Sequence, residues 1–159
     1  IWEHFFDETI NALNQDSEFA SYTSHEKVLS FLYTIIEVFK QNRSFIVLKV
    51  GELSRKDFRP KSLATFRTLY NNWVKEIVNK GLESEEIATR PIITEKYDEV
   101  FWGQFLYILR VWINDESKDF QTTDAAIEKT SALIFELLKK GPIDLLIDFL
   151  KFAYQNKAY

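Results

Sequence analysis

The sequence of 159 residues contains no cysteine and no methionine, and it has only four glycines and three prolines. The absence of cysteine excludes disulfide frameworks, thiolate nucleophiles and cysteine-ligated zinc sites. No apolar run approaches the ~20 residues of a membrane-spanning helix. The first residues, IWEHFFDETI, lack the basic and apolar segments of a secretory signal peptide. Because the chain begins inside a helical pattern and not at a methionine, we expect it to be a fragment.

A strongly basic surface is not indicated either, since 24 acidic residues outnumber 20 basic ones and the net charge is -4. This segment alone is not expected to bind DNA, because nucleic-acid binding needs a basic face. Hydrophobic residues make up 46% of the chain and aromatic residues 16%. That is enough for the core of one domain spanning residues 1–159. We expect a soluble, cytoplasmic protein without stable membrane association.

Helical periodicity extends along the whole chain, and no β-alternation persists, so the sequence predicts an all-α fold of about seven helices. The predicted helices cover residues 1–14, 24–41, 44–53, 63–80, 95–114, 122–140 and 142–155. The apolar stretch 45–50 is also β-prone, but a strand there would have no partner strand. The fold class is therefore predicted from periodicity, with one short segment left open between helix and strand.

Several helix ends carry recognisable signals. Residues 23–26, Thr-Ser-His-Glu, form a capping box in which the threonine and glutamate side chains satisfy free backbone amides. Thr94 is predicted to cap the fifth helix. Gly81 is predicted to end the fourth helix as its C′ residue. Gly141 is predicted as another C′ residue, followed by Pro142 at the first position of the last helix.

Two of the predicted helices are more apolar than one buried face requires. The helix 95–114 is apolar on three sides, so one side is predicted to face the domain core and another to line a cavity or meet a second subunit. The helix 142–155 is apolar except for the line Asp144, Asp148, Lys151 and Gln155. Another surface must therefore cover that helix.

The segment VWINDESKDFQTTD contains the densest acidic group, Asp115, Glu116 and Asp119. A metal loop or a catalytic acid cluster is one interpretation of it. An EF-hand requires a central glycine and a distal glutamate, and this segment has no glycine. We favour a solvated corner between two helices, in which Ser117, Asp119 or Thr122 caps the second helix.

The remaining residues and motifs that could take part in catalysis do not indicate an enzyme. His4 and His25 are the two histidines, and neither lies in a metal-binding or catalytic pattern. Glycine-rich phosphate loops, dinucleotide fingerprints and nucleophile elbows are absent. We therefore predict no catalytic residue, no metal and no cofactor.

Aromatic residues give the stronger signal, with 14 phenylalanines, 7 tyrosines and 4 tryptophans. Filling the core explains most of them. Many nonetheless lie on the inner sides of two long helices, where bulky flat side chains can leave an apolar cavity between helices. We hypothesise that a small apolar ligand binds among Tyr33, Phe66, Tyr70, Trp73, Phe101, Phe105 and Trp112.

The order of these segments resembles the C-terminal, effector-binding and dimerisation domain of TetR-type transcription regulators. The resemblance rests on IWEHFFDETI, on YTSHEKVLSFLYTIIEVFKQNRSF and on the connector VNKGLESEEIATRPI. It continues through FWGQFLYILRVWINDESKDFQTTDAAIEKTSALIFELL, with a Trp-x-x-Asp-x-Ser corner, and through the terminal GPIDLLIDFLKF. Each piece is weakly specific, whereas their order and spacing together are more specific.

The resemblance implies a helical domain that forms a two-fold homodimer through a four-helix bundle. The predicted dimer interface is Leu109, Trp112, Ile113, Ile127, Thr130, Ile134 and Leu138. It also implies a small effector molecule in the core and a helix-turn-helix headpiece before Ile1, through which alone DNA would be bound. Residues 1–14 would then be the remnant of the helix that connects to this headpiece.

The alternative is a lipid carrier, because ubiquinone-biosynthesis accessory proteins resemble this fold and use it to hold an isoprenoid lipid at a membrane. The apolar last helix is compatible with that role. Its end carries few cations beyond Lys151 and Lys157, however, which argues against a strong membrane anchor.

Overall fold

The computed structural model describes residues 1–51 and 53–157, and within these ranges the chain is helical and contains no strand. The helices are α1 (Trp2–Asn14), α2 (Ser24–Lys40), α3 (Arg43–Gly51), α4 (Ala64–Glu83), α5 (Tyr97–Ile113), α6 (Gln121–Leu138) and α7 (Pro142–Asn156). The all-α prediction is confirmed. The segment 45–50 belongs to helix α3, so the strand alternative is wrong.

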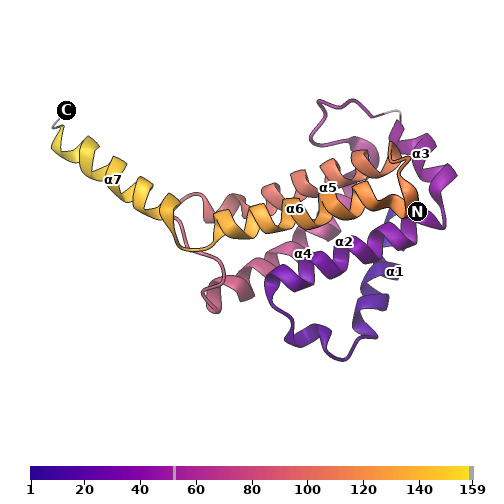
Figure 1. The fold of residues 1–159 in the computed structure, drawn as a ribbon, viewed down its shortest axis with the longest axis horizontal. Helices are drawn as coiled ribbons and strands as arrows, with labels where there is room; N and C mark the ends of the chain where they lie inside the picture. The colour runs from indigo at the N-terminus through magenta and orange to yellow at the C-terminus, as the bar shows by residue number, and fades with distance from the viewer. Residues whose placement is uncertain (52, 158–159) are drawn as a thin grey trace.

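Five helices form the body of the molecule. Helix α1 packs against α2 and α4, α5 packs between α4 and α6, and α6 closes the layer against α2. Short α3 lies at the end of the bundle where the N-terminus is found, and α7 projects beyond the opposite end (Figure 1). The side chains in the centre are mostly aromatic, and the largest completely buried ones include Trp102, Trp112, Tyr70 and Tyr97.

The predicted capping box at the start of α2 is confirmed. The Thr23 hydroxyl accepts a hydrogen bond from the Glu26 amide at 3.1 Å, and the Glu26 carboxylate accepts one from the Thr23 amide at 3.3 Å. A second acid completes this helix end, since the Glu86 carboxylate accepts from the amides of Ser24 and His25 at 2.8 and 2.9 Å. The first turn of α2 is therefore tied to the connector after α4.

The prediction for Gly81 is wrong, because α4 continues through it to Glu83. Gly81 is buried, and a Cβ atom built there would lie 2.6 Å from Cδ1 of Ile87 and 2.9 Å from Oγ of Ser24. The glycine is thus required by close packing between α4, α2 and the connector, and it does not terminate a helix.

Two further helix-end predictions are wrong, and one is confirmed. Thr94 lies in a 3₁₀ turn before α5, where its hydroxyl exchanges hydrogen bonds with the Arg90 backbone at 2.7 Å. Gly141 has an extended backbone with φ 176°, so it is not a left-handed C′ residue. It instead forms the N-cap of α7 and donates its amide to Asp144 at 2.9 Å. Pro142 does occupy the first turn of α7.

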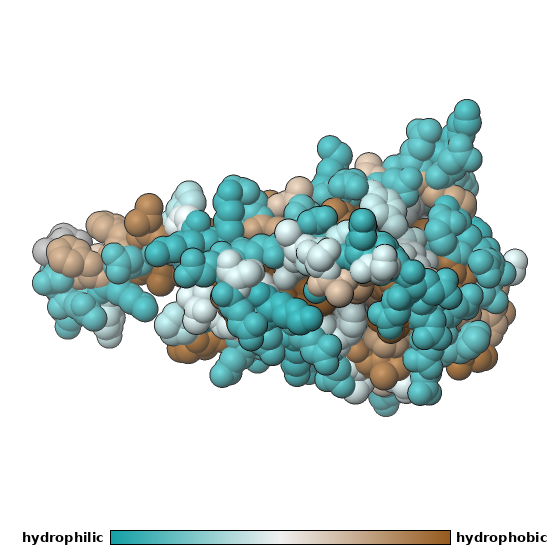
Figure 2. All heavy atoms as spheres, turned by 90° about the horizontal axis from the view of Figure 1, so that it is seen from below, coloured by the Kyte–Doolittle hydropathy of each residue, from teal (hydrophilic) through white to brown (hydrophobic). Residues whose placement is uncertain are grey.

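The hydropathy of the surface differs between the body and α7. In Figure 2 the body is largely hydrophilic, while the projecting α7 end carries hydrophobic side chains beside hydrophilic ones. No helix in the described ranges is both long and apolar enough to cross a membrane.

Candidate functional site

The seven residues of the predicted ligand site lie in or beside one aromatic core. Phe66, Tyr70, Phe101, Phe105 and Trp112 are buried, and Tyr33 and Trp73 are partly buried. The centre of the set is compact: the Phe66 and Phe105 rings stack with centroids 4.8 Å apart, and Tyr70 lies 5.4 Å from Phe105. The helical spacing on α4 and α5 therefore brings these three rings together.

The other members reach the centre through residues outside the predicted set. Trp112 packs on Phe39 at 5.8 Å, and Phe39 in turn packs on Phe105 at 6.4 Å. Trp73 packs on Phe31 at 4.6 Å between ring centroids. Phe31 and Phe39 lie on the inward stripe of α2, and that periodicity would have allowed us to include them.

Two members lie toward α6. The Phe101 ring contacts Phe135 at 5.5 Å. Tyr33 donates its hydroxyl hydrogen to the Glu128 carboxylate at 2.6 Å and so joins α2 to α6 near the surface. Burial and this bond to a carboxylate both raise the pKa of Tyr33. Tyr33 therefore acts in this structure as a neutral hydrogen-bond donor at the edge of the core.

The centre of the core is filled by side chains. The more prominent hollows of the described surface are lined by other residues, and none of the seven takes part in them. A ligand at the predicted position would therefore need some of these side chains to move. One polar atom is left without a partner there: the buried indole N–H of Trp112 makes no hydrogen bond.

The predicted dimer residues are divided between the core and the surface. Leu109, Trp112, Ile127 and Leu138 are buried inside the chain, whereas Ile113, Thr130 and Ile134 are partly exposed. The periodicity of an evenly apolar helix does not say which of its stripes faces the chain's own core. The large apolar side chains that α5 and α6 present to solvent are Val100, Tyr107, Leu133 and Leu137, which are 44–59% exposed. We call these four residues the α5–α6 face.

A buried polar contact joins the two helices beneath this face. The Gln104 amide nitrogen donates to the hydroxyls of Thr130 and Ser131 at 3.0 and 2.8 Å, while its buried amide oxygen has no hydrogen-bond partner. Because the two donated bonds would be lost if the helices slid past each other, they favour one alignment of α5 and α6. The α5–α6 face is therefore displayed on a fixed pair of helices.

The acidic segment forms the corner between α5 and α6, as predicted, and the Ser117 hydroxyl caps α6 by accepting a hydrogen bond from the Thr122 amide at 3.1 Å. Asp115, which was not among the predicted caps, contributes more bonds. The buried Asp115 carboxylate accepts hydrogen bonds from the amide and hydroxyl of Ser117 and of Thr123. Burial alone would raise the pKa of Asp115, but these four hydrogen bonds outweigh burial and hold the pKa at about 2. Asp115 is thus the cap that binds the start of α6 to the end of α5.

The chain turns this corner with two consecutive left-handed residues, Asp119 (φ 51°) and Phe120 (φ 56°). Phe120 turns back onto Trp112, and the Arg43 guanidinium lies 4.7 Å from the Trp112 ring and 4.9 Å from the Phe120 ring. Arg43 also donates to the carbonyl of Trp112 at 3.2 Å. No group of three or more metal-ligating side chains occurs within residues 1–51 and 53–157.

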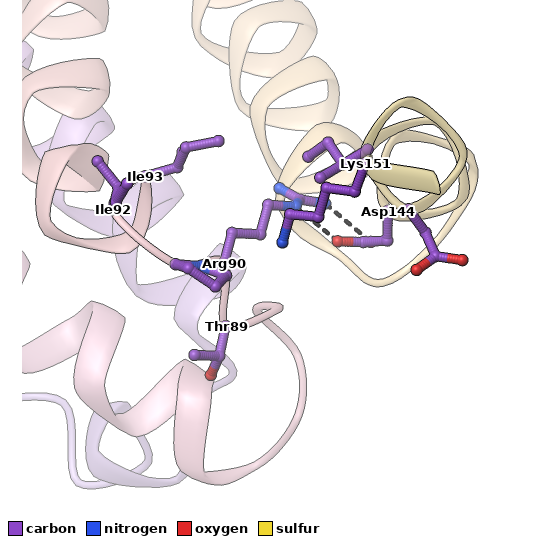
Figure 3. A pocket seen from close by; sticks show the side chains of 9 residues that line it. Thr89, Arg90, Ile92, Ile93, Asp144 and Lys151 are labelled. Atoms are coloured by element: carbon purple, nitrogen blue, oxygen red, sulfur yellow. Dashed lines mark hydrogen bonds and ion pairs between the residues drawn. The ribbon is translucent and has the colours of Figure 1, made fainter. Parts of the chain in front are cut away.

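A hollow at the root of α7 was not predicted from the sequence. It is lined by the connector residues 89–93 and by the polar side of α7, including Asp144 and Lys151 (Figure 3). The Arg90 guanidinium forms a two-pronged ion pair with Asp144, at 2.8 and 3.1 Å, although Arg90 is only 5% exposed. The ion pair with Arg90 and a bond from the Gly141 amide lower the pKa of Asp144 to about 2.

Comparison with known proteins agrees with the fold described above, an all-α bundle with a polar corner between two buried antiparallel helices. The family described as "Tetracyclin repressor-like, C-terminal domain" matches residues 27–153. The chain therefore belongs to this family, and the resemblance inferred from its segments is confirmed. Neither a curated protein nor a solved structure matches the chain.

Proposed function

We propose that this chain is the effector-sensing and dimerisation domain of a TetR-family transcription regulator. The match over residues 27–153 supports membership of a family of repressor-like C-terminal domains. In this proposal a small apolar molecule enters the aromatic core, and a helix-turn-helix headpiece preceding α1 binds DNA. The ligand acts by changing the position of α1, which links core and headpiece.

The observation that carries the ligand proposal is the unpaired indole N–H of Trp112. A buried donor without an acceptor costs on the order of 1–3 kcal/mol, which a suitable ligand can recover. The surroundings are aromatic, with Phe39, Phe105 and the other core rings close by. We therefore propose a ligand that is mostly apolar and carries one hydrogen-bond acceptor directed at Trp112.

Helix α1 is placed to respond to such a ligand. The Trp2 ring meets Phe39 at 6.0 Å and Phe66 at 6.4 Å, and Phe6 meets Phe66 at 5.9 Å. Rearrangement of Phe66 would therefore displace the packing surface of α1. Two headpieces must match half-sites about one DNA turn, ~34 Å, apart, so a small tilt of α1 would alter DNA affinity. This switch requires the ligand to bind the two arrangements with different free energies.

We further propose that two copies associate through the α5–α6 face. Exposed apolar side chains on adjacent helices mark interaction sites when they form a contiguous patch. The four residues of this face replace the buried members of the predicted interface, while Thr130 and Ile134 remain at its edge. Leu133→Glu should then convert a dimer into a monomer in sedimentation equilibrium, whereas Ala132→Glu, at an exposed position on another side of α6, should not.

The regulatory proposal is tested with the full-length protein. Fluorescence anisotropy on its promoter DNA would be measured with and without compounds that displace the dye 1-anilinonaphthalene-8-sulfonate from the core. We expect such compounds to change DNA affinity in the wild type and to act more weakly on Trp112→Phe. Unchanged DNA affinity at saturating compound would refute the switch. The carrier alternative instead predicts an isoprenoid lipid in organic extracts of the purified protein, detected by mass spectrometry.

A further inference from the structure

Helix α7 exposes an apolar surface that residues 1–51 and 53–157 leave uncovered. None of its residues is buried among the described ranges. Five of its apolar side chains, Leu145, Leu146, Phe149, Leu150 and Phe152, are 55–73% exposed and lie on one side of the helix, and we call them the apolar arc. A helix whose large side chains remain in water is not stabilised by tertiary packing, which is the usual source of helix stability.

The orientation of α7 is the reverse of that expected for a helix packed on its own domain. Its polar line, with Asp144, Asp148 and Lys151, lines the hollow next to the connector 89–93 (Figure 3). The apolar arc lies on the remainder of the helix circumference, turned away from that hollow. The apolar arc is therefore displayed, while the polar line, together with Ile143 and Ile147, faces the chain itself.

An ion pair between buried Arg90 and partly exposed Asp144 fixes this orientation. Arg90 donates to both oxygens of Asp144, to the carbonyl of Lys139 at 3.1 Å and to the hydroxyl of Tyr97 at 3.3 Å. Separating Asp144 from Arg90 would leave the buried guanidinium without its carboxylate, and an unpaired buried charge is destabilising. Helix α7 cannot fold its apolar arc back onto the bundle without breaking this ion pair. The arc is therefore available to a second molecule.

Charge and continuity identify that molecule. An anionic membrane surface would attract a helix rich in lysine and arginine, but the polar line of α7 carries two acids beside Lys151, and the whole chain has a net charge of -4. The apolar surface instead continues into the proposed dimer surface, because Ile143 of α7 lines one apolar hollow together with Val100 and Leu137. The arc and the α5–α6 face thus form adjoining parts of one apolar surface.

The small area of the α5–α6 face also favours a second copy of the chain as the partner of the arc. Stable interfaces remove about 800 Å² from each partner. The face consists of four side chains that are already about half buried, so their remaining exposed surface supplies only a small part of that area. The apolar arc adds five large side chains, and an aromatic side chain alone contributes about 150–250 Å² when fully buried.

We propose that α7 is an intermolecular arm whose apolar arc packs against a second copy of this chain, extending the α5–α6 interface at the end away from α1. This inference rests on the proposed homodimer. Each copy would lend its arm to the other, as two-fold symmetry requires. The arm would thereby contribute a large part of the buried apolar area of the dimer.

Sedimentation equilibrium of the full-length protein tests the arm. Phe149→Glu places a charge in the apolar arc, and we expect it to raise the dimer dissociation constant by about tenfold or more. Gln155→Glu adds the same charge on the polar line of the same helix and should leave the constant unchanged. Circular dichroism and thermal unfolding of both variants show whether the fold is retained, which is expected because both positions are exposed.

Leu133→Glu, on the α5–α6 face, separates the two proposals. If Leu133→Glu dissociates the dimer while Phe149→Glu behaves like the wild type, the arm is refuted and the proposed dimer stands. If the wild type is a monomer at high concentration, both are refuted. A direct contact is detected by cross-linking, since the chain has no cysteine of its own. A short bismaleimide should join two copies of Phe149→Cys more efficiently than two copies of Gln155→Cys.

Flotation with vesicles of phosphatidylglycerol and phosphatidylcholine tests whether a membrane surface covers the apolar arc instead of a second copy. We expect the full-length protein not to float with them. Flotation that is lost in Phe149→Glu, together with an unchanged dimer dissociation constant, would overturn the arm in favour of a lipid surface.

Discussion

Asp115 and Thr123 are joined twice: the Asp115 carboxylate accepts the backbone amide of Thr123 at 2.8 Å and its hydroxyl at 2.6 Å. Thr123 is completely buried, so both donors would otherwise lie in a region without water. This pair closes the corner between α5 and α6. It therefore sets the relative position of the two helices that carry the proposed dimer surface.

Replacing Asp115 by asparagine should lower the free energy of unfolding by about 2 kcal/mol, because an amide cannot accept all four hydrogen bonds as a carboxylate does. Glu116→Gln is the matched control, since Glu116 is exposed and a change there should stay within about 0.5 kcal/mol. Urea unfolding at neutral pH measures both. An Asp115→Asn variant as stable as the control would remove Asp115 from its capping role.

The contribution of Asp115 should also depend on pH. Its pKa is about 2 in the folded chain and ~3.9 in an unfolded one, so the folded state favours the ionised form. The stabilisation is complete above pH ~4 and is lost as the pH falls through about 2. The difference between wild type and Asp115→Asn should therefore shrink across this interval. A difference that stays constant from pH 5 to pH 2 would contradict the assignment.

Gly81→Ala should destabilise the protein even though alanine favours helices over glycine by about 1 kcal/mol. The added methyl group would meet Ile87 and Ser24 at distances of 2.6–2.9 Å, and overpacking of this kind costs roughly 1–3 kcal/mol. Gly51→Ala is the control, because no atom lies within 4 Å of the new Cβ. Thermal unfolding should show a lower midpoint for Gly81→Ala than for Gly51→Ala.

Ile92→Gly should stabilise the protein. Ile92 has φ 70°, a conformation that is strained for a β-branched residue, and it forms the centre of a turn in which the Ile93 amide donates to the Pro91 carbonyl at 2.8 Å. Relief of this strain should exceed the entropic cost of glycine by about 0.5–1 kcal/mol. Ile93→Gly, at a neighbouring position with φ -73°, should destabilise instead. Equal effects of the two substitutions in urea unfolding would exclude backbone strain as the cause.

Arg90→Met should loosen α7 more than the body of the molecule. The substitution removes the two-pronged bond to Asp144 and the bond to the Lys139 carbonyl. Hydrogen exchange measured by mass spectrometry should show faster exchange in residues 142–156, with a smaller change in α5. Lys151→Met serves as control, because Lys151 is exposed and lines the same hollow. Uniformly faster exchange throughout the chain would mean that Arg90 supports the whole fold instead.

Local signals in the sequence were sufficient to predict the helices and the capping box at Thr23. They were not sufficient at Gly81, where a contact with Ile87 and Ser24, distant in sequence, overrides the ordinary meaning of a glycine near a helix end. The acids at 115–119 were correctly placed in a corner. Which of them caps α6 depends on the left-handed turn at Asp119 and Phe120, and composition does not reveal that turn.

The candidate sites were harder to predict than the helices. Helix α5 is apolar on three sides, so periodicity could not separate buried Leu109 from exposed Tyr107. Aromatic spacing placed Phe66, Tyr70 and Phe105 together, but it could not distinguish a filled core from a cavity, because that depends on how side chains from α1 and α2 close over them. The ligand site and the dimer interface stay predictions.

Five residues of the connector between α4 and α5, residues 86–90, bind two parts of the chain that are distant in sequence. Glu86 binds the first amides of α2, the Ala88 amide donates to the Leu138 carbonyl at 2.7 Å, and Arg90 binds the root of α7. Because the backbone from 86 to 90 is short and bonded at both ends, the first turn of α2 and the base of α7 are mechanically coupled. A partner that repositions α7 would therefore pull on the helix against which α1 packs.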